Sequence, residues 1–331
     1  MQAQKPKTKN RKPQTAFKAA ILAAGLGTRL RPLTNLVPKP LMPVLNRPLL
    51  GLLLAQLAAA GFTRVAVNTH HLAARVQEFL QGEGPPGLNL RISHEPELLG
   101  TGGGLKQLGE VLGGGPFLAV NSDILTDLEL KAVFREHRQG AITTLVLHDC
   151  PPYNKVWVAG GRVVSIGGAA EAPGGTPLAY TGVQVVSPVM LDYLPPAGQP
   201  YDLVAAWREA LAAGERLDAL VVSGRFWQDL GDPTAYLALH RRLLAGASPE
   251  LARFIPGLAD PLVGPGARVA AGVRFLGGVC LGAGVEVGAG ASLKNTVVWP
   301  GAVIAPEVSL KDCIVAAGVR VTASVRGRVL V

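Results

Sequence analysis

From residue 17 onward, short apolar runs alternate with segments whose apolar residues have helical spacing. Alternating strands and helices are typical of a mostly parallel sheet covered by helices on both faces. The pair Gly160-Gly161 between two β-rich segments predicts an antiparallel hairpin. The pattern predicts strands at 19–24, 65–67, 88–92, 117–120, 142–147, 155–159, 162–166 and 217–223, and helices at 49–60, 72–81, 103–112, 127–138, 201–213 and 233–245.

The pattern changes to a period of six after about residue 258. One series of apolar residues runs from Val263 to Trp299, and a second series, shifted by four positions, runs from Ala267 to Val303. A six-residue period with turn glycines is typical of a parallel β-helix, although a glycine-rich β-sandwich is an alternative. The segment resembles the left-handed β-helix of the hexapeptide-repeat proteins, and we expect its phase to slip beyond about residue 305.

Length and composition fit two folded domains with a short tail. The chain has 331 residues, of which 48% are hydrophobic and 17% charged, so it can bury substantial cores. The formal charge of +9 owes much to six basic residues and no acid within residues 1–18. We expect a disordered basic tail at 1–16, an α/β catalytic domain at 17–250 and the β-helix at 258–331.

The same arithmetic limits the partners and the compartment. The longest apolar run, Leu49–Ala60, is shorter than the roughly 20 residues that span a bilayer, so we expect no membrane partner. The body of the chain is nearly balanced in charge, so we expect no nucleic-acid partner either. The three cysteines are odd in number and lack metal-ligand spacing, which favours a reducing cytoplasm.

The segment after the first predicted strand has the chemistry of a phosphate site. Gly25 and Gly27 permit close approach of the backbone to an anion, and Arg29 and Lys39 supply positive charge. A loop leaving a parallel strand lies at the carboxyl edge of the sheet, where ligands bind in such folds. The loop lacks the third glycine of the dinucleotide fingerprint and the Gly-Lys-Ser/Thr of the P-loop, so it belongs to neither class.

Two linked motifs resemble the signature of the sugar-1-phosphate nucleotidyltransferases. Residues 22–32 read LAAGLGTRLRP, and residues 38–41 read PKPL. Three further segments, over residues 95–104, 121–123 and 227–233, are similar to later motifs of that family and read EPELLGTGGG, NSD and WQDLGDP. The last departs from the family pattern at Asp232, where a threonine is usual. The resemblance covers about residues 17–245 and implies a Rossmann-like, three-layer catalytic domain.

That resemblance implies a reaction in which an NMP group passes from an NTP to a sugar 1-phosphate and pyrophosphate is released. The implied catalytic residues are Arg29 and Lys39, and Mg²⁺ is expected on Asp123 and Asp229. The sugar phosphate has Asn154 and Lys155 as candidates, although a solvated turn is an equal alternative for these two, and Thr181 and Gly182 are candidates for the sugar pocket. The implied nucleotide-binding residues are Ala24, Gly25, Gly27, Thr28, Glu95, Gly100, Thr101 and Gly102.

Several alternatives stay open within this class. The core resembles N-acetylmuramate-1-phosphate uridylyltransferases, whereas a core joined to a hexapeptide tail resembles mannose-1-phosphate guanylyltransferases or glucose-1-phosphate enzymes. Some relatives of this architecture are non-catalytic regulatory subunits, but this chain keeps the basic and acidic residues of the site. All six histidines precede the predicted β-helix, so we expect that helix to serve oligomerisation, effector binding or capping rather than acetyl transfer.

Overall fold

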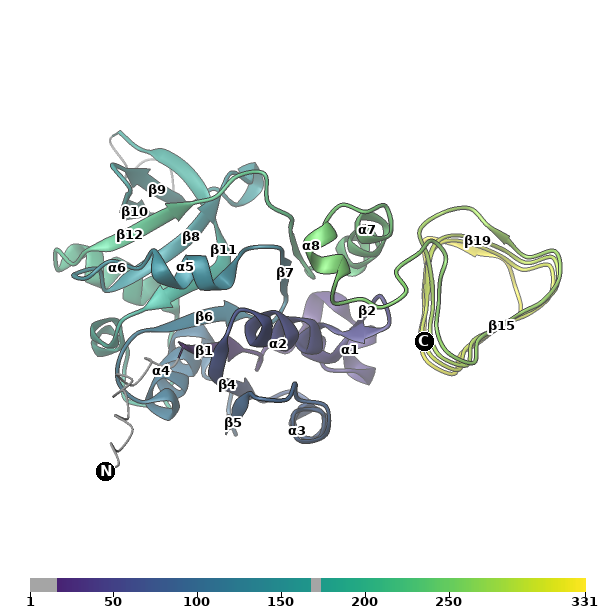
Figure 1. Cartoon of the computed structure of the whole chain (residues 1–331), viewed down its shortest axis with the longest axis horizontal. Coiled ribbons are helices and arrows are strands. Elements are labelled where there is room, and N and C mark those ends of the chain that lie inside the picture. Colours follow the sequence, from purple (N-terminus) through teal and green to yellow (C-terminus); the bar gives the residue numbers. More distant parts are fainter. Residues whose placement is uncertain (1–16, 168–173) are drawn as a thin grey trace, which may run out of the picture.

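The computed structural model describes residues 17–167 and 174–331, and the expected disordered tail lies outside them. The chain forms an α/β domain, from Phe17 to Ala252, and a stack of coils, from Leu262 to Leu330, which lie side by side (Figure 1). No described helix is both long and apolar enough to cross a bilayer.

A nine-stranded sheet forms the centre of the α/β domain, in the order β5-β4-β1-β6-β11-β8-β12-β10-β9. The pairings β5–β4, β4–β1, β1–β6 and β8–β12 are parallel, and the other four on this path are antiparallel. The expected mostly parallel sheet is therefore wrong for its second half. The strands are β1 Phe17–Leu22, β4 Phe62–Thr69, β5 Asn89–His94, β6 Phe117–Asn121, β8 Thr143–His148, β9 Val156–Ala159, β10 Arg162–Ile166, β11 Thr176–Val186 and β12 Leu217–Val221.

The central strand β11 was missing from the sequence-based prediction, and it causes this difference. It inserts between β6 and β8 and runs antiparallel to both. Its residues after Gly182 are buried on both faces, so they show no alternation of apolar and polar residues. The predicted hairpin is confirmed as β9 and β10, paired antiparallel.

Helices cover both faces of the sheet and make the predicted three layers. Alternate residues of β1 point to opposite faces, with Ala20 in one core and Ala19 and Ile21 in the other. Helices α4 and α6 pack over the first core, and α2, α3 and α5 pack over the second. The helices are α1 Leu33–Leu36, α2 Leu49–Ala59, α3 Ala73–Gly82, α4 Gly100–Leu112, α5 Leu130–Arg135, α6 Leu203–Ala212, α7 Pro233–Leu244 and α8 Pro249–Ala252.

Short elements complete the carboxyl edge of the sheet. A two-stranded antiparallel ribbon joins β7 to β13, and a second one joins β2 to β3. Several single turns of 3₁₀-helix shape the loops around them. These elements are β2 Pro43–Val44, β3 Arg47–Pro48, β7 Ile124–Thr126, β13 Trp227–Asp229, η1 Thr28–Leu30, η2 Lys39–Leu41, η3 Pro151–Tyr153 and η5 Pro188–Tyr193.

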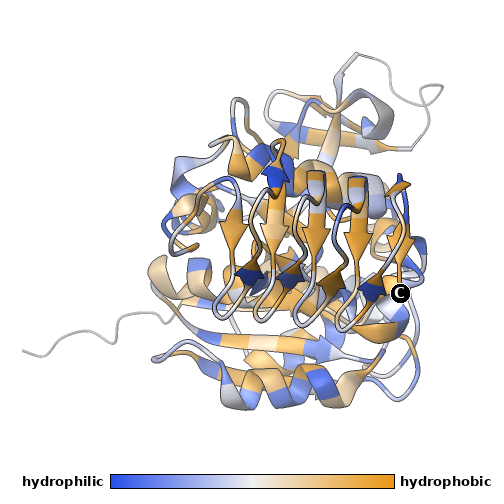
Figure 2. Cartoon of the chain, turned by 90° about the vertical axis from the view of Figure 1, so that its right-hand side faces the viewer, coloured by the Kyte–Doolittle hydropathy of each residue, from blue (hydrophilic) through white to orange (hydrophobic). Residues whose placement is uncertain are grey.

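The coil stack consists of short parallel strands, and Figure 2 shows its successive coils side by side. In the first coil, Val263 pairs with Leu281 and Val269 with Val287, so one coil takes 18 residues, or three repeats of six. The strands are β14 Leu262–Val263, β15 Arg268–Val269, β16 Arg274–Phe275, β17 Val279–Leu281, β18 Glu286–Val287, β19 Ser292–Val298, β20 Val303–Ile304, β21 Ser309–Val315, β22 Arg320–Val321, β23 Val325–Arg326 and β24 Val329–Leu330.

The phase of the repeat slips earlier than expected. Leu281 pairs with Val298, 17 residues on, so the slip lies before residue 298 and not beyond 305. Trp299 and Val297, which the six-residue series places inside the coils, instead lie in the contact with the α/β domain. Val263 is 45% exposed because the first coil has no further coil to cover it.

The two parts of the chain are joined by a shared apolar core. Cys280, Val297 and Ile314 occupy matching positions on three adjacent coil strands and are buried against the α/β domain. On the other side, Tyr236 of α7 is fully buried. Its hydroxyl donates to the carbonyl oxygen of Pro43 and accepts a 3.1 Å hydrogen bond from the Trp299 indole.

We expect Tyr236→Phe to lower the free energy of unfolding by about 1–3 kcal/mol, because it leaves two buried polar groups without a partner. Urea denaturation followed by circular dichroism measures this change. Tyr153→Phe is the matched control, since Tyr153 is exposed, and it should leave the free energy unchanged. Equal stability of the two variants would contradict the importance of the buried hydroxyl.

Candidate active site

The loop after β1 is held in a conformation that only its own residues allow. Gly27 has φ +64°, and a Cβ there would lie 2.8 Å from Cγ2 of Thr34. The Thr34 hydroxyl donates to the Gly27 carbonyl oxygen at 2.9 Å. At the start of the loop, the backbone N–H of Ala23 donates to Oδ1 of Asn68 at 2.5 Å. The loop is therefore anchored at both ends before any ligand binds.

A cavity of about 330 Å³ opens above this loop, at the carboxyl edge of the parallel strands. Its walls come from the loop, from η2, from the start of α4 and from the segment after β6. This is where nucleotides bind in open α/β folds. Nine predicted site residues line it: Ala24, Gly25, Gly27, Thr28, Arg29, Lys39, Gly100, Thr101 and Asp123.

Two predicted nucleotide ligands lie behind the cavity wall. Glu95 is fully buried, and its two oxygens accept hydrogen bonds from Nδ2 of Asn68 at 2.6 Å and from the backbone N–H of Leu99 at 3.0 Å. A Cβ on Gly102 would lie 3.0 Å from the carbonyl oxygen of Tyr201. In the structure these residues shape the wall of the cavity and do not face its interior.

Asn68 is a site residue that sequence reasoning missed. It lies near the end of β4, lines the cavity, and connects the loop after β1 with Glu95 through both ends of its side chain. Asn121 and Ser122, next to Asp123, also line the cavity. The available signal was the position of Asn68 at the end of a predicted parallel strand, since such strand ends converge at one edge of the sheet.

The two predicted metal ligands meet across the β7–β13 ribbon. Asp229 is paired with Ile124, and the backbone N–H of Leu230 donates to the Asp123 carbonyl oxygen at 2.9 Å. Nζ of Lys39 lies 2.6 Å from Oδ2 of Asp123. Oδ2 of Asp229 and Nη1 of Arg29 lie 2.9 and 3.2 Å from the position that a Cβ on Gly231 would occupy. Two acids and two bases thus converge on one point.

The electrostatics of this cluster are strained in favour of added positive charge. Burial, and then the nearby charge of Asp123, raise the pKa of Asp229, while Lys39 and Arg29 oppose that rise. Among residues 17–167 and 174–331 no group of three or more His, Cys, Asp or Glu side chains could hold a metal. The donor set is therefore two carboxylates, which suits an ion such as Mg²⁺ that keeps water and phosphate oxygens as its other ligands.

A second cavity, of about 320 Å³, lies at the other end of the same ribbon. Thr181 lines it together with His148, Asp149 and Trp227. The indole of Trp227 donates to the Thr181 carbonyl oxygen at 2.8 Å and packs edge-on against the His148 ring. Because Trp227 and Asp229 are two residues apart on β13, their Cα atoms are about 7 Å apart, and the two cavities share the ribbon as a common wall.

The remaining predicted sugar ligands have other surroundings. The side chain of Asn154 accepts from the backbone N–H of Cys150 at 2.9 Å and donates to Asp149 at 2.7 Å. Lys155 is exposed, and it does not line the second cavity. Gly182 has φ +83°, and a Cβ there would lie 2.7 Å from Ile124, so this glycine allows β11 to pack against the ribbon.

Fold and site together define an α/β protein that binds the phosphates of a nucleotide beside a pair of carboxylates. Residues 18–246 match the family model described as Nucleotidyl transferase, which is more than half of the chain. The chain therefore belongs to the nucleotidyl transferase family.

Named relatives extend over different shares of the chain. An N-acetylmuramate alpha-1-phosphate uridylyltransferase of Neisseria meningitidis is 38% identical over 53% of this chain and 78% of its own. A mannose-1-phosphate guanylyltransferase of Mycobacterium tuberculosis is 30% identical over 92% of this chain and 81% of its own. A crystal structure of HddC from Yersinia pseudotuberculosis has a TM-score of 0.57 at 22% identity, covering 67% of this chain and 97% of that one, and it shows the fold.

We expect Asp229→Asn to stabilise the ligand-free protein at pH 7. A carboxyl whose pKa is higher in the folded than in the unfolded state lowers stability wherever it is ionised in both states. The penalty vanishes as the pH falls to the ordinary pKa of 3.8 and below. The difference in Tm between variant and wild type, measured by calorimetry from pH 7 to pH 4, should therefore be positive at pH 7 and shrink with acidification.

The matched control is Asp192→Asn at an exposed aspartate, which should leave the Tm unchanged across the same pH range. A lower Tm for Asp229→Asn at pH 7 would show that the carboxylate is stabilised by its neighbours, contrary to this account.

Proposed function

We propose that the first cavity binds an NTP and that the chain transfers the NMP group to a sugar 1-phosphate, with release of pyrophosphate. The observation that carries this conclusion is the convergence of Arg29 and Lys39 with Asp123 and Asp229 at the mouth of a glycine loop. The bond that forms joins a phosphate oxygen of the sugar 1-phosphate to the α-phosphorus. The bond that breaks joins that phosphorus to the oxygen bridging it to the β-phosphorus.

The reaction needs positioning and charge compensation more than proton transfer. The second pKa of a phosphate monoester is about 6, so the attacking oxygen is already ionised near pH 7 and requires no general base. Arg29 and the amides of Gly25–Thr28 would hold the β- and γ-phosphates. Lys39 would compensate the charge that grows on the α-phosphate in the transition state. Gly100 and Thr101, at the start of α4, face the base and ribose.

Mg²⁺ is the cofactor that fits the carboxylate pair. It would be held by Asp123 and Asp229 and would neutralise phosphate oxygens of the nucleotide. The raised pKa of Asp229 supports this assignment, because a divalent cation relieves the mutual repulsion of the two carboxylates. In this structure Lys39 supplies part of that compensation through its ion pair with Asp123.

The second cavity fits the acceptor sugar. Thr181, His148 and Asp149 offer hydrogen-bonding groups, and the Trp227 ring offers an apolar face for the sugar. The ribbon that separates this cavity from the first carries Asp229, so a 1-phosphate group bound at the ribbon reaches the nucleotide side. Asn154 and Lys155 lie next to Asp149 in sequence and stay candidates for the rim of this site.

Two pairs of substrates fit the family relationships. UTP with N-acetylmuramate 1-phosphate is supported by the relative with 38% identity, which covers 53% of this chain. GTP with mannose 1-phosphate is supported by the relative that covers 92% of this chain and so includes most of the coil stack. A glucose-1-phosphate uridylyltransferase of Synechocystis, 31% identical over 77% of the chain, makes UTP with glucose 1-phosphate a third candidate.

For the coil stack we propose the left-handed β-helix of hexapeptide-repeat proteins. The 18-residue coil of three six-residue repeats supports this. Homo-oligomers are proposed to form through the stack, because its first coil exposes Val263, Val269 and Leu276. A cytoplasmic location is proposed from three cysteines without a disulfide among the described residues.

The proposed function predicts pyrophosphate release in the presence of Mg²⁺ for one cell of a substrate grid. The grid combines ATP, CTP, GTP and UTP with mannose, glucose and N-acetylmuramate 1-phosphates. One nucleotide with one sugar should exceed the other cells at least tenfold, and chelation of Mg²⁺ by EDTA should abolish the signal. Activity that persists in EDTA would overturn the metal assignment.

Asp123→Ala should lower kcat roughly 10²–10³-fold, because the nucleotide phosphates lose a charge-compensating metal ligand. Steady-state kinetics with the best substrate pair measure it, and Asp192→Ala is the exposed control. Near wild-type turnover by Asp123→Ala would show that this carboxylate holds no catalytic metal.

A further inference from the structure

A third cavity, of about 320 Å³, lies between the α/β domain and the coil stack. One wall is α7, and the other wall is formed by β19, β21, β24 and the turn before β24. It shares no lining residue with the nucleotide cavity or the proposed sugar cavity. The cavity exists only because the two parts of the chain are docked together.

Two positive charges from different parts of the chain face this cavity. Arg241 comes from α7 and Arg328 from the turn before β24. Within residues 17–167 and 174–331, neither guanidinium makes an ion pair or a side-chain hydrogen bond. A guanidinium group prefers to bind oxyanions through paired N–H donors, so two of them at one cavity favour an anionic ligand.

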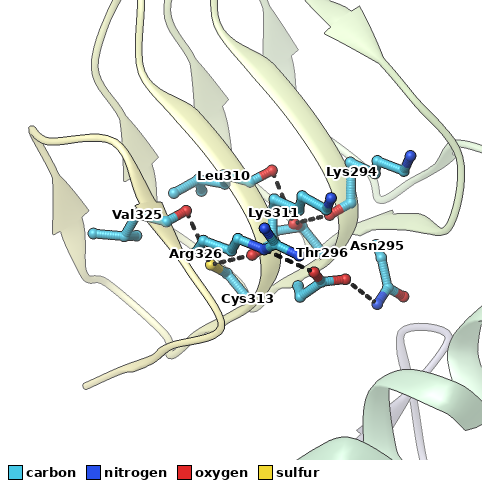
Figure 3. A network of polar contacts seen from close by, with 9 residues as sticks. Lys294, Asn295, Thr296, Leu310, Lys311, Cys313, Val325 and Arg326 are labelled. Atoms are coloured by element: carbon cyan, nitrogen blue, oxygen red, sulfur yellow. Dashed lines mark hydrogen bonds and ion pairs between the residues drawn. The ribbon is translucent and has the colours of Figure 1, made fainter.

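The single acid of the cavity is already compensated by its neighbours. Asp312 accepts a 2.8 Å hydrogen bond from Nδ2 of Asn295, and Nε of Arg326 lies 3.7 Å from its other oxygen. Figure 3 shows this network on the surface of the coils, with Asn295 on the side that faces the neighbouring helix. The charge left for a ligand is therefore that of Arg241 and Arg328.

Asn295 gives a second and independent sign of an incomplete site. It lines the cavity, and its Oδ1 is buried without a hydrogen-bond donor among the described residues. Buried amide oxygens are normally paired, so an unpaired one beside a cavity marks a place for a donor from a ligand or water. Its backbone has φ +44°, so the side chain is directed by a turn rather than by the regular strand pattern.

Apolar residues complete the walls. Leu237 from α7 and Ile314 and Val329 from the coil stack line the same cavity. Its volume is at the lower end of the range for small-molecule sites. A ligand that fills it thus combines an anionic group, a hydrogen-bond donor and an organic body.

We propose that this interdomain cavity is a regulatory binding site for a small organic phosphate ester. The phosphate would bind between Arg241 and Arg328, and a hydroxyl or amino group of the ligand would donate to Asn295. A sugar phosphate and a nucleoside monophosphate share this chemistry, and the experiment below separates them.

The cavity has a direct structural connection to the carboxylate cluster, so its regulatory role rests on the proposed function. Helix α7 begins at Pro233, four residues after Asp229. Its first turn is capped by Asp232, whose side chain accepts from the backbone N–H of Ala235 at 2.9 Å. A ligand that holds α7 against the coil stack therefore biases the position of Asp229, and by linkage Mg²⁺ at that carboxylate biases the ligand.

Binding is tested by titration calorimetry on the full chain with three probes: glucose 6-phosphate, adenosine 5′-monophosphate and inorganic phosphate. We expect one of the organic esters to bind more tightly than inorganic phosphate. Arg241→Gln and Arg328→Gln should each weaken that binding by roughly 10- to 100-fold, because each removes a charge-assisted contact. Arg274→Gln, at an exposed arginine of the coil stack, should leave it unchanged.

The variants should fold, because both cavity arginines are exposed and make no side-chain contact that folding requires. Arg29→Gln separates this site from the nucleotide cavity: binding at the proposed site should survive it. No binding of either ester at millimolar concentration, or binding lost in Arg29→Gln and retained in Arg241→Gln, would overturn the proposal.

Regulation is tested by the Mg²⁺ concentration that gives half-maximal turnover. The bound ester should change this concentration at least twofold in the wild type and leave it unchanged in the Arg241→Gln/Arg328→Gln double variant. An unchanged value in the wild type would overturn the coupling. The calorimetric result does not depend on turnover, so failure of the site and failure of the proposed reaction give different outcomes.

Discussion

Two carboxylates held close together in a half-buried position are the constraint on which the catalytic cleft depends. Asp123 and Asp229 meet across a short antiparallel ribbon, and burial together with their mutual repulsion raises the pKa of Asp229. Lys39 and Arg29 make this arrangement tolerable, and both residues also belong to the phosphate-binding side of the cavity. One set of charges therefore orders the loop and ribbon in the ligand-free protein and remains poised for nucleotide phosphates.

The ribbon also connects the parts of the molecule that take part in function. One end carries the carboxylates and the other carries Trp227 at the second cavity. After Asp229 the chain enters α7, whose Tyr236 is buried against the coil stack through the Trp299 indole. A short path of rigid elements thus leads from the proposed sugar pocket, through the metal ligands, to the interdomain cavity. This continuity explains how the coil stack could influence a reaction to which it contributes no residue.

Local patterns predicted much of the fold because they reflect local physics. The five strands of the first part of the sheet and the helices between them follow from apolar runs and helical spacing. The strand β11 escaped prediction, since a strand buried on both faces has no alternating pattern and Gly182 interrupts it. The site motifs were recognisable because a phosphate loop requires glycine and basic residues at fixed neighbouring positions.

The sequence by itself determined which residues carry the phosphate and metal chemistry, because their spacing within each motif is local. Only the tertiary structure decided how separate motifs meet. It placed Glu95 behind the wall, paired with Asn68, and brought Lys39 to Asp123. It also turned Val297 out of the coils and into the interface, because a coil shortened to 17 residues shifts the side chains that follow. Such contacts join residues far apart in the chain, and no periodicity records them.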